Sequence, residues 1–198
     1  MLKWLVLVLV LLPAAGCSVG KETPSLVVHE KSVPDASELG DYGEVPDFKL
    51  TSHLGRPITT QDLKGQVWVA CFFFTDCKNI CPMMTAQLSK LQEDYGKLGL
   101  KIVSISVNPE VDSPEKMAEH AERIGADPKT WLFLTGDKQK IIELSVSGFR
   151  LPADQDPNSH SNRFVLIDRQ GKIRGYYRSD EEEQIRVLHK TVEKLLSS

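Results

Sequence analysis

The sequence predicts one α/β domain in which buried strands alternate with helices. Of the 198 residues, 41% are hydrophobic and 26% are charged, a balance typical of a soluble globular domain. Residues 66–74 form an almost continuously apolar run, as expected of a central strand that is covered on both faces. A helical apolar period follows this strand, at spacings of four, three and four residues, in Met84, Leu88, Leu91 and Tyr95.

Turn and capping residues define the other elements. Pro82 suits the first position of the first helix, and Gly96 ends that helix. Ser113 caps the next helix and Gly125 ends it. In chain order, the predicted elements are a hairpin of strands 47–51 and 57–59, strand 66–74, helix 82–95, strand 100–107, a helix ending at 124, strand 131–134, helix 138–146, hairpin strands 162–167 and 172–176, and helix 180–196. This order is that of a thioredoxin-like fold with an added N-terminal β-hairpin and an inserted helix.

Composition excludes several classes of protein. The balance of apolar and charged residues argues against a disordered tail, a collagen-like fibre and a multi-span membrane protein. A formal net charge of -3 gives no support for binding to a phosphate backbone, so no nucleic-acid partner is expected. Four cysteines are too few for a disulfide-stapled scaffold, and each is therefore interpreted separately.

The first sixteen residues have the features of an export signal that ends at a cysteine. Lys3 precedes an apolar run over residues 4–12, which is too short to span a bilayer, and small residues lead into Cys17. This pattern resembles the lipobox of bacterial lipoproteins, in which cleavage leaves the cysteine as an acylated N-terminus. An ordinary secretory signal with an incidental cysteine is the alternative. We therefore expect residues 1–16 to be a signal peptide and Cys17 to carry lipid.

The chain is expected to divide into an anchor, a linker and a domain. Residues 17–45 mix charged residues, serine, proline and glycine without any apolar period, which indicates a flexible tether. Residues 46–198 form the predicted domain. The expected location is the bacterial cell envelope, with the lipid in a membrane and the domain on the extracytoplasmic, periplasmic side.

Chemistry is expected where the central strand meets the first helix. Cys77 and Cys81 lie four residues apart there, with the second thiol at the mouth of the helix. A helix N-terminus favours thiolates and so lowers thiol pKa values; Lys78 would add to this effect and Asp76 would oppose it. Two thiols at this spacing are within reach of a disulfide, and they are also able to hold one soft metal ion.

Structural roles are the alternative interpretation of the cysteines. A purely structural disulfide between Cys77 and Cys81 would close so short a loop that it would contribute little stability. Cys71 belongs to the buried strand, where a free thiol behaves as a small apolar core residue.

Three motifs in the predicted domain match one family. They are Phe74-Thr75-x-Cys77-x-x-x-Cys81-Pro82, then Ser106-Val107-Asn108-Pro109-Glu110-x-Asp112-x-Pro114-Glu115, and His160-Ser161 followed by Phe164-x-Leu166-Ile167-Asp168-x-x-Gly171. Together they resemble the Sco/SenC family from about residue 45 to the end. The chain differs in having Lys78 where many members have proline, and Asn108 where aspartate is usual.

The resemblance implies a copper chaperone. Family members bind Cu(I) or Cu(II) through the two cysteines and the histidine, and assist assembly of the CuA centre of cytochrome c oxidase. Carried onto this chain, the metal ligands are Cys77, Cys81 and His160, and the partner is the copper-receiving subunit of the oxidase. The donor chemistry agrees, because thiolates favour Cu(I) and an imidazole suits both oxidation states.

The remaining histidines are competing candidates for the third ligand. His160 follows a polar loop over residues 152–159, which is able to lie over a neighbouring site. His29, His53, His120 and His189 are instead expected to be solvated or hydrogen-bonded surface residues.

Two enzymatic alternatives remain. The first is a thiol-disulfide oxidoreductase, or a redox sensor, that cycles Cys77 and Cys81 and has no need of His160. Its three-residue spacer differs from the two-residue spacer of thioredoxin itself. The second is a relative of the peroxidases, which is disfavoured because Cys77 follows Thr75 by two positions and no Thr-x-x-Cys arrangement occurs.

Overall fold

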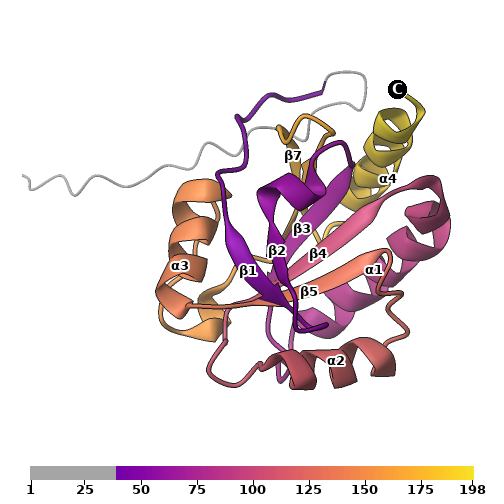
Figure 1. The fold of residues 1–198 in the computed structure, drawn as a ribbon. Coiled ribbons are helices and arrows are strands. Elements are labelled where there is room, and N and C mark those ends of the chain that lie inside the picture. The colour runs from indigo at the N-terminus through magenta and orange to yellow at the C-terminus, as the bar shows by residue number, and fades with distance from the viewer. Residues whose placement is uncertain (1–38) are drawn as a thin grey trace, which may run out of the picture. The chain divides into compact units, whose positions relative to one another are not determined.

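A seven-stranded sheet forms the centre of the domain in the computed structural model, which describes residues 39–198 (Figure 1). The strand order is β2-β1-β5-β4-β3-β6-β7. The strands are β1 (Lys49–Ser52), β2 (Pro57–Thr59), β3 (Trp68–Phe73), β4 (Lys101–Ser106), β5 (Trp131–Thr135), β6 (Arg163–Ile167) and β7 (Ile173–Arg178). The three central strands β3, β4 and β5 run parallel, and the outer strands pair antiparallel to their neighbours. The predicted α/β class is confirmed.

Helices cover both faces of this sheet. They are α1 (Cys81–Tyr95), α2 (Pro114–Arg123), α3 (Lys138–Glu143) and α4 (Glu182–Ser197). Every residue of β3 is buried, and its side chains alternate between two apolar clusters. Cys71 belongs to the cluster that α1, α2 and α4 line, and Phe72 belongs to the cluster that α3 lines. The continuous apolar run of β3 is explained by this burial on both faces.

The predicted elements occur in the predicted order, with one difference in the inserted helix. The expected helix at 138–146 is α-helical only to Glu143, and a wider π turn, Leu144–Gly148, completes it. Arg150 follows with a φ of 55°, and it is the only residue other than glycine with a positive φ between residues 39 and 198. A short 3₁₀ turn, Pro157–Ser159, then leads to His160.

Contacts with the sheet begin before residue 46. The backbone N–H of Tyr42 donates to the carbonyl of Ile173 at 3.0 Å, and that of Val45 donates to the carbonyl of Gly171 at 3.0 Å. Val45 is buried. Residues 42–45, which the sequence places in the tether, therefore pack on the domain.

The expected anchor lies outside the described residues. This holds for the signal peptide over residues 1–16, for Cys17, for His29 and for the tether up to residue 38. Within residues 39–198, none of the helices combines the length and the apolar character that crossing a bilayer requires.

Candidate metal centre

Cys77, Cys81 and His160 meet at the end of the central strand. One ligand atom from each of them lies within 4.8 Å of the other two, and this is the only such group of three among the described residues. Cys77 lies in the loop after β3, Cys81 is the first residue of α1, and His160 precedes β6. Because β6 pairs antiparallel with β3, the residues entering β6 lie beside those leaving β3. The three residues expected as ligands are thus brought together by strand pairing.

The imidazole of His160 presents Nε2 to the thiols. Its Nδ1 lies 3.0 Å from the carbonyl oxygen of Ser161, which only accepts hydrogen bonds, so Nδ1 carries the proton. Nε2 lies 3.7 Å from the Sγ of Cys81. Burial lowers the pKa of His160, against the effect of the Ser161 carbonyl, and this favours the neutral form that binds metals. The ring of Phe74 packs edge-on against the imidazole, with centroids 5.7 Å apart.

Phe74 and Ser161 both contact His160, and sequence reasoning does not single them out as residues of the site. Both stand inside the quoted motifs, immediately beside predicted strand ends. In a metal-binding histidine, the nitrogen that does not bind the metal usually donates a hydrogen bond to a nearby acceptor. The backbone carbonyl of the residue next to His160 was therefore a candidate for this acceptor.

The two thiols have opposite tendencies to ionise. Burial acts to raise the pKa of Cys77, but hydrogen bonds from the Cys81 thiol and from the backbone N–H groups of residues 79–81 bring that pKa below its ordinary value. Burial, followed by the effect of Cys77, raises the pKa of Cys81 far above its ordinary value. Cys77 is partly exposed and Cys81 is buried. Of the two thiols, Cys77 therefore ionises more readily than Cys81.

The charge of Asp76 is paired with a cation from α2. Nζ of Lys116 lies 2.8 Å from the Asp76 carboxylate. The pair is exposed, so it contributes little to stability. It does place a positive charge against the one carboxylate that adjoins Cys77 in sequence, which reduces the opposition to a thiolate that Asp76 alone would exert.

Cys71 is confirmed as a core thiol. Its side chain is 1% exposed, and Sγ lies 3.3 Å from the hydroxyl of Ser104, which also accepts the indole N–H of Trp131 at 2.9 Å. Burial raises the pKa of Cys71 to about 12. This thiol stays protonated at neutral pH.

The other described histidines lie outside the cluster. The expectation of a surface position is wrong for His53, which is 7% exposed, because the end of β1 folds back on β5 and Nδ1 of His53 accepts the backbone N–H of Phe133. His120 is partly exposed and packs on Phe133. His189 lies on α4, 3.6 Å from a carboxylate oxygen of Asp94.

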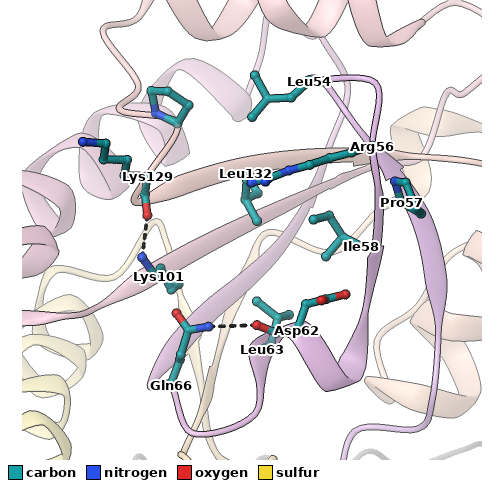
Figure 2. A pocket seen from close by; sticks show the side chains of 11 residues that line it. Leu54, Arg56, Pro57, Ile58, Asp62, Leu63, Gln66, Lys101, Lys129 and Leu132 are labelled. Carbon is teal, nitrogen blue, oxygen red and sulfur yellow. Dashed lines mark hydrogen bonds between the residues drawn. The ribbon is translucent and has the colours of Figure 1, made fainter.

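A separate hollow of about 910 Å³ opens on the β1–β2 hairpin and the beginnings of β4 and β5 (Figure 2). Arg56, Lys101 and Lys129 contribute positive charge to its lining. Its lining includes neither a cysteine nor a histidine. The Cys77, Cys81 and His160 cluster therefore has no part in this hollow.

The cluster has the dimensions of a three-coordinate metal site. Thiolate sulfur and imidazole nitrogen bind first-row metals at about 2.3 and 2.0 Å, so that two ligands of a planar, three-coordinate ion stand about 4 Å apart. The distance of 3.7 Å from Cys81 Sγ to His160 Nε2 and the limit of 4.8 Å for the whole group are close to this requirement. Two soft sulfur ligands with one imidazole suit copper.

Sequence comparison identifies the family. The model of the family described as SCO1/SenC matches residues 37–197. The chain belongs to the SCO1/SenC family. The match covers all of the described helices and strands, and it contains all three residues of the cluster.

Solved structures of the Sco family share the fold. A SCO1/SenC family lipoprotein from Bacillus anthracis is 34% identical, with a TM-score of 0.71 over 77% of this chain and 94% of that one. BsSco, described as a member of the Sco family of cytochrome c oxidase assembly proteins, is 29% identical, with a TM-score of 0.71 over 81% and 96%. Yeast Sco1 with copper bound is 25% identical, with a TM-score of 0.61 over 79% and 90%. The predicted thioredoxin-like fold of the Sco family is confirmed.

Proposed function

We propose that this Sco-family chain binds one copper ion through Cys77, Cys81 and His160, and that it delivers copper to the CuA site of cytochrome c oxidase or prepares that site. The observation that carries the proposal is the convergence of three ligand atoms within 4.8 Å from two distant parts of the chain. The copper-bound structure of yeast Sco1 and the description of BsSco as an oxidase assembly protein support it.

Exposure of the ligands suits transfer of the metal. Cys81 is buried, whereas Cys77 and His160 are partly exposed. A cysteine or histidine of a recipient protein therefore approaches the copper from the side of Cys77 and His160. Replacement of one ligand at a time keeps the ion coordinated throughout the transfer. Delivery to the copper-receiving subunit of the oxidase is the reaction that this arrangement serves.

Copper titration of the reduced protein tests the binding site. We expect one copper per chain, with thiolate-to-Cu(II) charge transfer in the absorption spectrum. His160→Ala should weaken copper retention at least tenfold, because it removes one of three ligands, and His189→Ala is the matched control on α4. Equal copper affinity in the wild type and His160→Ala would refute this ligand set.

We also propose that Cys17 is acylated and holds the domain on the extracytoplasmic side of a membrane in the bacterial cell envelope. The lipobox pattern supports this, and so does the description of the Bacillus anthracis relative as a lipoprotein. Replacing Cys17 with serine should move the chain from the membrane fraction to the soluble fraction and remove the fatty-acid mass. Retention of the lipid mass in Cys17→Ser would contradict the proposal.

A second candidate function is thiol-disulfide exchange, favoured by the contrast between a partly exposed Cys77 with a lowered pKa and a buried Cys81 with a raised pKa. In this reaction, Cys77 thiolate attacks a substrate disulfide and one substrate sulfur leaves as a thiolate. Cys81 then loses its proton and attacks Cys77, releasing the second substrate sulfur as a thiol. The substrate disulfide is reduced, and the Cys77–Cys81 pair is oxidised.

Substitution of His160 distinguishes copper binding from thiol-disulfide exchange. Exchange needs only the thiols, so His160→Ala should lose copper retention and keep the rate of exchange with a small disulfide. Cys77→Ser should lose both. Normal copper loading of the oxidase in cells that carry only Cys77→Ser would exclude both functions.

A further inference from the structure

Asp112 is a fully buried carboxylate that forms no ion pair with any described residue. Its side chain is 0% exposed. None of the ion pairs within residues 39–198 includes it. A buried charged group is costly unless hydrogen bonds satisfy it, so its partners indicate what it does.

Three hydrogen bonds join this carboxylate to the ends of two central strands. It accepts the backbone N–H of Thr75 at 3.1 Å and the Thr75 hydroxyl at 2.5 Å, just beyond β3. It also accepts the hydroxyl of Ser106, the last residue of β4, at 2.6 Å. Ser106 in turn accepts the backbone N–H of Asn108 at 3.0 Å. Asp112 thus fixes the carboxyl end of β3 to that of β4.

The segment that Asp112 holds is the one that carries the metal-binding geometry. Thr75 precedes Cys77 by two residues, and the backbone N–H of Cys77 donates to the carbonyl of Phe74 at 3.3 Å. The ring of Phe74 packs on His160. Fixing Thr75 therefore fixes both the start of the thiol loop and the ring against which the imidazole rests.

We propose that Asp112 is a positioning residue for the metal centre: its hydrogen bonds to Thr75 hold Cys77 at coordinating distance from Cys81 and His160. The residue acts through Thr75 and does not touch the metal. The inference rests on the proposed copper site, and it deepens that proposal.

Two substitutions of Asp112 distinguish a role of its hydrogen bonds from a role of its negative charge. Asp112→Ala removes all three hydrogen bonds. Asp112→Asn removes the charge, but its amide oxygen still accepts the Thr75 N–H and the Ser106 hydroxyl, while its NH₂ group donates to the Thr75 hydroxyl oxygen. In competition with a chromogenic Cu(I) chelator, Asp112→Ala should lose about tenfold or more in affinity, and Asp112→Asn should stay near the wild type. Equal losses of Cu(I) affinity in both variants would show that Asp112 acts through its charge, and would overturn the positioning role.

A matched control distinguishes positioning from loss of stability. Asp168 is 3% exposed and lies in the turn between β6 and β7, where it pairs with Arg174. Asp168→Ala should lower the melting temperature and leave Cu(I) affinity unchanged. If Asp112→Ala does not fold, Thr75→Val serves instead, because it deletes the hydroxyl bond and keeps the N–H bond. Wild-type affinity in a folded Asp112→Ala or in Thr75→Val would overturn the inference.

A measurement made without copper tests the role of Asp112 independently of the proposed copper binding. Positioning of Cys77 against Cys81 also sets the equilibrium in which the dithiol and oxidised glutathione give the protein disulfide and two molecules of reduced glutathione. Asp112→Ala should shift this equilibrium several-fold, and Asp168→Ala should not. If the wild type binds no copper, the proposed function fails. If Asp112→Ala leaves the glutathione equilibrium unchanged, positioning fails.

Discussion

Cys77 and Cys81 have the same side chain, but their different positions at the start of α1 give their thiols different pKa values. The backbone N–H groups at the mouth of the helix point toward Cys77, while Cys81 is turned into the apolar cluster on that face of the sheet. The motif predicts a reactive pair from spacing alone, but spacing does not show which thiol ionises. That depends on burial and on hydrogen bonds, which only the fold defines.

Alkylation should distinguish the three described thiols. In reduced, copper-free protein at pH 7.5, iodoacetamide should modify Cys77 first, because its pKa is lowered and its side chain is partly exposed. Cys81 should react more slowly, and Cys71 only after unfolding. Peptide mass mapping over time measures the three rates. A Cys81 that reacts as fast as Cys77 would show that the thiol asymmetry is absent.

The elements that carry the ligands were largely predictable. The apolar run of β3, Pro82 at the start of α1 and the glycines after α1 and α2 are strong local signals, and each predicted the observed element. The π turn Leu144–Gly148 and the left-handed Arg150 were not predictable. An arginine gives no local signal for a positive φ.

Arg150 should tolerate glycine and reject a β-branched residue. A left-handed conformation costs about 1 to 2 kcal/mol in a residue with a Cβ, and branching adds to the crowding. Arg150 already bears the first of these costs, so Arg150→Val should lower the free energy of unfolding by the added crowding alone, about 0.5 to 1.5 kcal/mol for a strained χ1. Arg150→Gly gains from the relaxed φ and loses a similar amount through the freer unfolded chain. Urea denaturation of the two variants measures both effects, and equal stability of Val and Gly at this position would contradict the expected strain.

At the scale of the whole molecule, the order of elements and the residues of the site were predictable, but the environment of the site was not. His160 was identified because its motif resembles the Sco/SenC family, since a histidine at the end of a polar loop is a weak signal by itself. The contacts of Asp112 and the burial of His53 depend on strands far apart in sequence. Local patterns carry no information about such pairings.

Acidification below pH 6.5 should destabilise the domain. Burial lowers the pKa of His53, His120 and His189 below the ordinary value of 6.5. As the pH falls below 6.5, the unfolded chain binds protons at these residues before the folded chain does, so the free energy of unfolding decreases. The loss levels off below the lowered pKa values, and these residues contribute no pH dependence well above pH 6.5.

Urea denaturation of copper-free protein at pH 7.5, 6.5 and 5.5 measures this dependence. His53→Asn is an informative variant, because its amide oxygen takes the place of Nδ1 as the acceptor for the N–H of Phe133 and does not titrate. Its stability should fall less between pH 7.5 and 5.5 than that of the wild type. Constant wild-type stability across this range would show that these three histidines take up no additional protons on unfolding.

The distance along the chain between the ligands has a consequence for biosynthesis. His160 contacts Cys81 across 79 residues, and it reaches the thiols only because β6 adds to β3. A growing chain therefore contains both thiols well before the imidazole has been made, and in that interval the three-ligand site is incomplete. A copper ion that needs all three ligands binds only to molecules in which β6 has paired with β3. By mass action, copper therefore stabilises the folded state over states in which this pairing is absent.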